Sequence, residues 1–222
     1  MNRAFRIVCV SILCLCFKCV VHAQNLVAFP QGDAGWKVEI SPQASANTAP
    51  PVAAPAHPVH VEVTQLNKVK RIEITWSDGK KTEKWVIPGL PVVFNEDPRD
   101  GTVRPRQYGG PAEAAANAAF TYDSFAFTWI TPQCLQEKDP ISYKGKQCFH
   151  YLGSITVTFP VKRAPMKREA WIDASTLLPV ALNTDDMQSV FTFQDPPPTG
   201  TLTPPPAFQK EITYYKIVMG YP

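Results

Sequence analysis

The stretch VHVEVTQLNKVKRIEITWSDGKKTEKWVI, residues 59–87, decides the fold class. Apolar and polar residues alternate over 59–64 and again over 71–76. A period of two predicts strands with one apolar and one solvated face, which is typical of antiparallel sheets. Asp78-Gly79 stands between two such runs and is a strong hairpin signal. The stretch therefore predicts an antiparallel β-meander.

The rest of the chain adds strands on both sides of this meander and two short helices. The remaining strands are predicted at 36–40, 91–94, 154–159, 168–172, 180–183 and 188–193, with turns at 144–146 and 173–179 and a loop at 97–110. Helix-forming composition marks 111–119. The second helix is predicted at 206–219, where Phe208, Ile212, Tyr215 and Met219 share one face and Gly220 suits the position after the end. The fold class is therefore mainly β, with one or two short helices.

Residues 1–23 have the features of a secretory signal peptide. The segment begins with Arg3 and Arg6, continues with an apolar run too short to span a bilayer, and ends Val21-His22-Ala23 before Gln24. We expect export to the periplasm or the medium, with no transmembrane span left after cleavage.

Residues 24–222 are predicted to form a single β-rich domain, because all-β folds of this length are routinely one domain. All 23 prolines lie in this part of the chain. They concentrate in a Pro-rich loop at 41–58 and a Pro-rich segment at 196–206, neither of which has the composition to build a core.

The charge balance argues against a nucleic-acid partner. The whole chain has 22 Lys+Arg and 19 Asp+Glu, and loss of Arg3, Arg6 and Lys18 with the leader leaves equal numbers. A nucleic-acid-binding domain is expected to carry a basic surface. No basic excess remains after export.

Two cysteines, Cys134 and Cys148, lie outside the leader, and His150 follows the second. An oxidising compartment favours a disulfide between them, closing a loop of about 15 residues that is worth about 3 kcal/mol. A catalytic thiol would have to be kept reduced, and a zinc site with His150 lacks the usual spacing and a fourth ligand. We therefore expect a structural disulfide.

The sequence carries no motif that predicts catalysis. His-Glu-x-x-His, Gly-x-Ser-x-Gly and a phosphate-binding Gly-rich loop are all missing from it. His57 and His60 lie in or beside the Pro-rich loop, and Asp185-Asp186 and Glu96-Asp97 are adjacent acids of the kind found in solvated turns. The chain is expected to be no enzyme and to need no cofactor and no metal.

Tryptophans in or beside the predicted strands allow two interpretations. They fill the core of a sheet, or they line a concave face that holds an apolar ligand. The candidate apolar-ligand face consists of Val61, Val63, Ile72, Ile74, Trp76, Trp85, Trp129 and Trp171.

Two stretches resemble the bacterial outer-membrane lipoprotein carrier superfamily, the group of LolA, LolB and RseB. The first is the meander from Glu62 to Lys80. The second, Ala170 to Val180, is similar to a strand–turn–strand pattern W-[IV]-D-x-x-T-x-x-P-V. The tail, Phe191 to Phe193 followed by prolines and the 206–219 helix, resembles small exported bacterial proteins of similar layout.

This resemblance implies an unclosed, strongly bent antiparallel half-barrel that binds acyl chains or apolar peptide. The chain differs from those carriers in its cysteine pair, its Pro-rich runs and its scarcity of amphipathic helix. The expected function is that of an exported, non-catalytic binding protein holding an apolar or lipid ligand. The alternative is a structural or interaction protein that docks a protein partner in the cell envelope.

Overall fold

The computed structural model describes residues 26–43, 56–107, 122–155 and 165–222. Within these residues the fold is one antiparallel sheet of 11 strands with a single α-helix, α2 (Pro206–Met219), and two 3₁₀ turns, η1 (Ser124–Phe127) and η2 (Pro132–Cys134). The strands are β1 (Ala34–Pro42), β2 (Pro58–Leu66), β3 (Val69–Trp76), β4 (Lys81–Val86), β5 (Val92–Glu96), β6 (Val103–Gln107), β7 (Ile141–Tyr143), β8 (Lys146–Ile155), β9 (Met166–Asp173), β10 (Pro179–Thr184) and β11 (Met187–Phe193).

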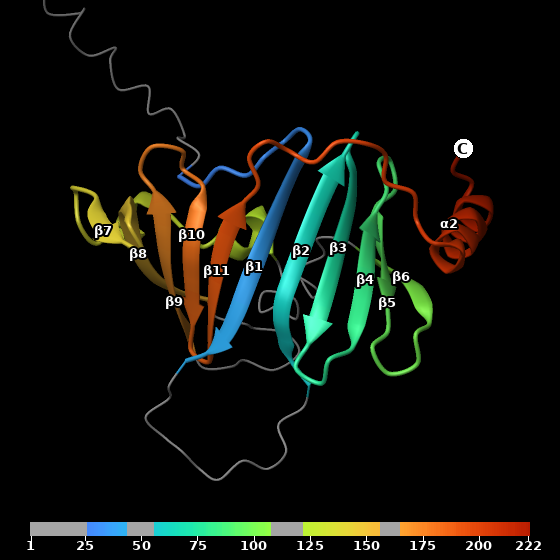
Figure 1. Ribbon diagram of the computed structural model, residues 1–222, viewed down its shortest axis with the longest axis horizontal. Helices are drawn as coiled ribbons and strands as arrows, with labels where there is room; N and C mark the ends of the chain where they lie inside the picture. The colour runs from blue at the N-terminus through green and yellow to red at the C-terminus, as the bar shows by residue number, and fades with distance from the viewer. Residues whose placement is uncertain (1–25, 44–55, 108–121, 156–164) are drawn as a thin grey trace, which may run out of the picture.

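The sheet is open. Its strand order is β6-β5-β4-β3-β2-β1-β11-β10-β9-β8-β7, so β6 and β7 are its two edges (Figure 1). The first and last strands meet in the middle, where Trp36 on β1 pairs with both Val63 on β2 and Phe193 on β11. The prediction of a mainly β, antiparallel, unclosed sheet is therefore confirmed.

Turn residues explain the hairpins that join the strands. Asn67 and Lys68 connect β2 to β3 with φ of 49° and 67°, and Lys144 and Gly145 connect β7 to β8 with φ of 49° and 78°. Two consecutive positive φ values are the geometry that suits a tight hairpin to the twist of its strands. Gly79, with φ of 83°, completes the predicted turn between β3 and β4.

Register divides the side chains between two faces of the sheet. The inner face carries Trp36, Val38, Val61, Val63, Ile72 and Ile74, which are all buried. Residues 26–29 and 122–135 pack against it, and Trp36 donates its indole N–H to the carbonyl of Tyr122 at 2.9 Å. In Figure 1 the segment around η1 lies behind the strands. The main core is therefore on the inner face.

The outer face has two smaller apolar clusters. Helix α2 covers one, in which Phe208 is 3% exposed and lies with its ring centroid 6.1 Å from that of Trp85. The other lies at β8–β10, around Trp171 and Cys148. The predicted helix is confirmed, with Gly220 in the left-handed conformation just after its end. Met219 is exposed and does not share the packed face of Phe208.

Several predicted element boundaries are wrong. Residues 97–110 were expected to be a loop, but β6 runs through them. β7 was not predicted, and β8 begins at Lys146, well before the predicted strand 154–159. The predicted bounds of the Pro-rich loop 41–58 are wrong at both ends, because Ser41 and Pro42 pair with β11 and Pro58 begins β2. The predicted helix 111–119 lies outside the described residues.

Candidate functional site

The two cysteines are free thiols on opposite faces of the sheet, so the predicted disulfide is wrong. Cys134 packs over the inner face of β8, where its Sγ lies 3.3 Å from the position that a Cβ on Gly153 would take. Cys148 belongs to the outer cluster with Trp171. Cys148 and Gly153, the residue under Cys134, are five residues apart on β8, which is a distance of about 16 Å along the strand. A disulfide needs Cα atoms within about 7 Å of each other. Burial raises the pKa of the Cys148 thiol.

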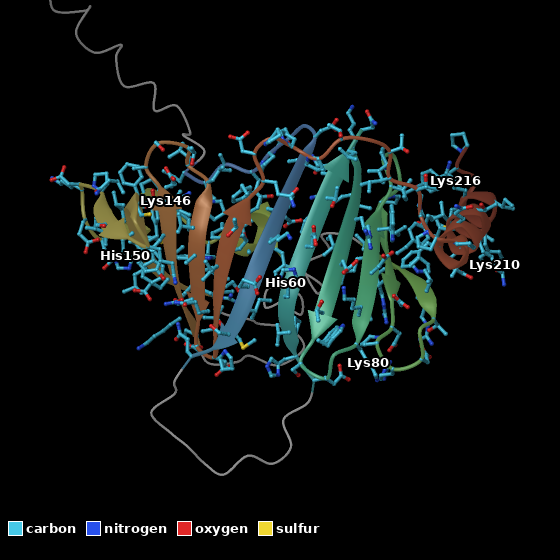
Figure 2. The ribbon with its side chains drawn as sticks, viewed as in Figure 1. His60, Lys80, Lys146, His150, Lys210 and Lys216 are labelled. Carbon is cyan, nitrogen blue, oxygen red and sulfur yellow. The ribbon has the colours of Figure 1, made fainter. Side chains whose placement is uncertain are left out.

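His150 is held by carboxylates rather than by the cysteines. Its Nδ1 lies 3.2 Å from Glu137 Oε2 and its Nε2 lies 2.9 Å from Glu169 Oε1. The imidazole stacks on Trp171, which also stacks on Tyr143 (centroids 5.2 Å and 4.2 Å apart). Figure 2 places His150 at the β8 end of the sheet. Trp171 is thus packed between aromatic neighbours and is only 8% exposed. No cluster of potential metal ligands occurs among the described residues.

The structure separates the members of the candidate apolar-ligand face. Val61, Val63, Ile72 and Ile74 are together on the inner face, but they are packed into the core. Trp129 packs against the same cluster. Trp85 and Trp171 lie on the outer face and cannot contribute to the same surface. Of the candidate face, Ile74 and Trp76 stand at a place where the inner face is hollowed.

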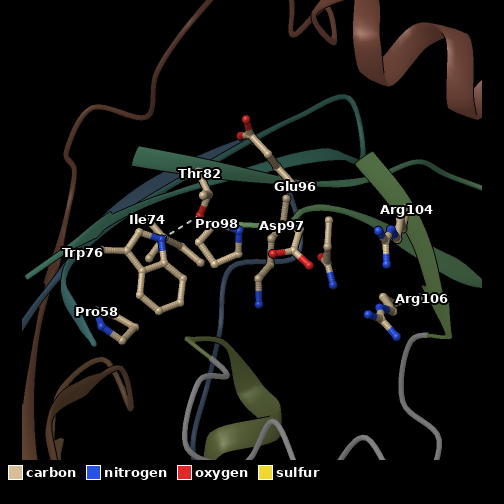
Figure 3. A pocket seen from close by; sticks show the side chains of 11 residues that line it. Pro58, Ile74, Trp76, Thr82, Glu96, Asp97, Pro98, Arg104 and Arg106 are labelled. Carbon is tan, nitrogen blue, oxygen red and sulfur yellow. Dashed lines mark hydrogen bonds between the residues drawn. The ribbon is translucent and has the colours of Figure 1, made fainter. Parts of the chain in front are cut away.

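That hollow is a pocket of about 210 Å³ at the β3–β6 end of the inner face (Figure 3). Pairing across the sheet explains it: Ile74 opposes Thr82, Lys84 opposes Asn95, and Asn95 opposes Arg104. Residues that oppose one another point to the same side of the sheet. The lining consists of Pro58, Ile74, Trp76, Thr82, Lys84, Asn95, Glu96, Asp97, Pro98, Arg104 and Arg106.

The two ends of this pocket differ in chemistry. Trp76, Ile74 and Pro58 make an apolar end, where the Trp76 indole N–H donates to Thr82 Oγ1 at 2.9 Å. The other end carries Arg104 and Arg106 on β6, as Figure 3 shows. An apolar ring and a pair of cations therefore face one small space.

The acidic side chains at the pocket have partners of their own. Asp97 accepts two hydrogen bonds from the Arg99 guanidinium, at 2.9 Å and 2.7 Å, and this contact holds the pKa of Asp97 well below its usual range. Glu96 Oε2 accepts the backbone N–H of Glu83 at 3.1 Å. Arg104 lies 3.5 Å from the exposed Asp100 and also helps to lower the pKa of Asp97, whose main partner is Arg99. The carboxylates beside the two arginines are thus held mainly by groups other than the pocket arginines.

One more group at the pocket is unsatisfied. Asn95 Oδ1 is buried and accepts no hydrogen bond within the described structure. Buried amide oxygens in native proteins are nearly always paired. The pocket wall therefore contains an amide oxygen without a hydrogen-bond partner, on a residue that opposes Arg104.

Sequence reasoning missed Lys84, Asn95, Arg104 and Arg106. The sequence predicts a loop for the two arginines because residues 97–110 are polar and carry Gly and Pro. Proline and charged residues are typical of edge strands as well as of loops. The alternation of Arg104 and Arg106 was the signal that could have placed both on one face.

Comparisons with known proteins assign no family. No family model matches the chain, and no curated protein matches it. Among solved structures, it is similar to the crystal structure of the Mycobacterium tuberculosis lipoprotein LppX, with 12% identity and a TM-score of 0.40. The match covers 76% of this chain and 89% of that one. A likeness at this level carries no inference about ligand or activity.

Proposed function

We propose that this chain is an exported, non-catalytic, single-domain binding protein that holds an amphiphilic ligand with an apolar body and an anionic group. The observation that carries the proposal is the Trp76 pocket, in which an apolar end and the Arg104–Arg106 end share one cavity. The pocket residues supply hydrogen bonds, charge and apolar surface rather than a nucleophile with its base.

The apolar end suits a hydrocarbon or aromatic group. Trp76 offers a ring that is half-buried and already oriented by its hydrogen bond to Thr82. Binding pockets are mostly apolar with a few placed polar groups. At about 210 Å³ the cavity is smaller than the ~300–1,000 Å³ typical of pockets for drug-sized molecules. It fits one end of a ligand or a small ligand.

The cationic end suits a carboxylate, sulfonate or phosphate. Guanidinium groups bind such anions through paired, charge-assisted hydrogen bonds. Arg104 and Arg106 lie on an edge strand and are exposed. A ligand can therefore approach them from solvent without unfolding the sheet.

The test is a titration with 8-anilinonaphthalene-1-sulfonate, an apolar probe with one anionic group. We expect wild type to bind it, and Arg104→Gln with Arg106→Gln, or Trp76→Ala, to weaken Kd about tenfold or more because each change removes one end of the site. Lys210→Gln with Lys216→Gln is the matched control, since it removes two positive charges from α2 (Figure 2), and neither lysine lines the pocket. Equal probe fluorescence from wild type and both pocket variants would contradict the proposal.

A second candidate function, docking of a protein partner in the cell envelope, is favoured by α2. Tyr214, Ile217 and Val218 are 64%, 75% and 59% exposed, although they are apolar or aromatic. Large exposed apolar side chains that gather on one element mark interaction surfaces. If wild type does not bind the probe, and a copurifying protein is lost in Ile217→Glu, docking is the better account.

Export is part of the proposal and rests on residues 1–23. We expect protein recovered from the periplasm or medium to begin at Gln24, and intact-mass measurement checks this. A full-length species embedded in the membrane would contradict it. Within residues 26–43, 56–107, 122–155 and 165–222, no helix has the length and hydropathy of a membrane span.

A further inference from the structure

A buried arginine without hydrogen-bond acceptors lies on the inner face, at the far end of the sheet from the Trp76 pocket. Arg168, on β9, is 2% exposed. Its Nε and Nη1 are buried and have no partner within the described structure. In register it opposes Gly153 on β8 and Thr184 on β10.

This arrangement is costly in the unliganded protein. A guanidinium stays protonated in proteins, so it cannot avoid the cost of burial by becoming neutral. An unpaired buried charge is among the most destabilising features a fold can contain. Natural proteins therefore pair such groups, or keep them for a ligand.

The acid beside Arg168 compensates for it only in part. Asp185 raises the pKa of Arg168, but less than burial lowers it. Asp185 is exposed, and its Oδ1 accepts the backbone N–H of Lys167 at 3.1 Å. Asp185 therefore interacts with the guanidinium electrostatically but accepts no hydrogen bond from Nε or Nη1.

The surroundings of Arg168 on the inner face are apolar. Ala170 and Leu182 are buried on the same side of β9 and β10. The Trp129 ring and Cys134 Sγ lie over Gly153, the residue that opposes Arg168. Glycine is required there, because a Cβ would come within 2.7 Å of the Trp129 ring. Arg168 is therefore the cation in a largely apolar site.

We propose that Arg168 binds the oxyanion, carboxylate or phosphate, of a ligand whose apolar part lies against the inner face. The oxyanion accepts the N–H groups that the protein leaves unpaired, and the partly buried Trp129 offers apolar surface to the chain. This site is separate from the Trp76 pocket, since three strands, β1, β11 and β10, lie between β9 and β2, the nearest strand that lines the pocket.

The experiment compares four probes on the purified protein: laurate, dodecyl phosphate, dodecanol and inorganic phosphate. Binding is measured by calorimetry and by the shift in thermal midpoint, because a ligand of the native state raises Tm. The variants are Arg168→Met, Arg168→Lys and Lys210→Gln, the last being an exposed cation on α2.

We expect wild type and Lys210→Gln to bind laurate or dodecyl phosphate and to bind dodecanol at least tenfold more weakly. In the Arg104→Gln, Arg106→Gln background, where the Trp76 pocket no longer contributes, Arg168→Met should bind the anionic probes at least tenfold more weakly than the same protein with Arg168. The Tm of the single variant Arg168→Met without ligand should equal or exceed that of wild type, because methionine replaces an unpaired buried charge with an apolar chain of similar length. Tighter binding of laurate than of dodecyl phosphate identifies the oxyanion of the ligand as a carboxylate. Binding of inorganic phosphate but of neither dodecyl probe contradicts the apolar part of the proposal.

Anion binding in the Arg104→Gln, Arg106→Gln background that is equal with Arg168 and with methionine at position 168 would overturn the inference, as would wild type that binds none of the anions. A lower Tm of Arg168→Met without ligand, with no anion binding by wild type, would assign Arg168 a structural role satisfied by water. If Arg168→Met does not fold, binding of the anionic probes is compared between wild type and Arg168→Lys, because lysine keeps the charge and loses the planar donor set. Weaker binding by Arg168→Lys supports the site, and equal binding contradicts it.

The Arg104→Gln, Arg106→Gln protein is carried through the same titrations. If Arg104→Gln with Arg106→Gln removes all binding of the anionic probes, the Arg168 site is wrong and the Trp76 pocket stands. If Arg168→Met removes all of it, the Trp76 pocket is wrong and the Arg168 site stands. If each removes part of it and only the combined protein loses it completely, both sites stand.

Discussion

Replacing Trp36 with alanine is expected to lower the free energy of unfolding by about 4 kcal/mol, within the range for large aromatic residues removed from a core. Trp36 is 1% exposed. Its ring centroid lies 5.8 Å from that of Phe29 and 5.9 Å from that of Phe193, and its indole N–H is bonded to the carbonyl of Tyr122. The substitution leaves a cavity between β1, β11 and the segment that covers them. Urea unfolding followed by far-UV circular dichroism measures the change.

Two comparison variants separate the causes of this loss. Trp36→Phe keeps most of the apolar contact and loses the indole N–H, so it should cost about 1–3 kcal/mol through the unpaired Tyr122 carbonyl. Tyr214→Ala removes an aromatic residue that is 64% exposed and should change stability by no more than about 0.5 kcal/mol. If Trp36→Ala proved as mild as Tyr214→Ala, the inner face would not be the main core.

Replacing Asp173 with alanine is expected to cost about 2–3 kcal/mol at pH 7, the scale of hydrogen bonds to a charged group. Asp173 ends β9 and is 7% exposed. Its Oδ1 accepts the Ser175 hydroxyl at 2.6 Å and the backbone N–H groups of Ser175 and Thr176 at 2.9 Å and 3.2 Å. Its Oδ2 lies 3.3 Å from Lys146 Nζ. The carboxylate thus holds the whole β9–β10 turn, and chemical denaturation checks the cost of removing it.

The same contacts give Asp173 a predictable pH dependence. The Ser175 hydroxyl, followed by the backbone N–H groups and Lys146, holds the pKa of Asp173 well below its usual range, against burial, which raises it. A carboxyl whose pKa is lower in the folded state stabilises the fold above the unfolded pKa of about 3.9 and loses this contribution as pH falls further.

The stability difference between wild type and Asp173→Asn should therefore be constant above about pH 5 and shrink progressively below about pH 4. Asp186→Asn, which changes an exposed acid in the next turn, is the control and should show little difference at any pH. A difference that stayed constant down to pH 2 would show that the carboxylate charge is not what holds the turn.

Local chemistry made much of this fold predictable. Alternation over 59–64 and 71–76 placed β2 and β3, and Asp78-Gly79 placed the turn that follows them. Positive φ at Gly79 and Gly220 explains why glycine was informative at both positions. These signals act over a few residues, so a single sequence exposes them.

The parts that were not predicted depend on distant partners. The outer side of β8 carries Cys148, His150 and Leu152, so its residues do not alternate cleanly between apolar and polar. His150 is accommodated there by Trp171, Glu137 and Glu169, which come from other parts of the chain. The disulfide was inferred from compartment and loop length, but the position of a thiol on one or the other face of a strand depends on register. Register also determines which residues form the pocket. It places Trp85 and Trp171 on the face opposite to Trp76, and it pairs Asn95 with Arg104.

The meeting of β1 and β11 in the middle of the sheet has a consequence for the order in which the fold assembles. Hairpins such as β2–β3 and β9–β10 join neighbours in the chain and have a short loop to close, whereas Trp36 must find Phe193 across nearly the whole polypeptide. Contacts of such high sequence separation slow folding, because loop closure must be completed before they contribute any stability. During synthesis, one edge of β1 therefore remains unpaired until the last strand has emerged, and a nascent chain exposes there a strand rich in apolar residues. The two halves of the sheet become one cooperative unit only when this final ladder forms.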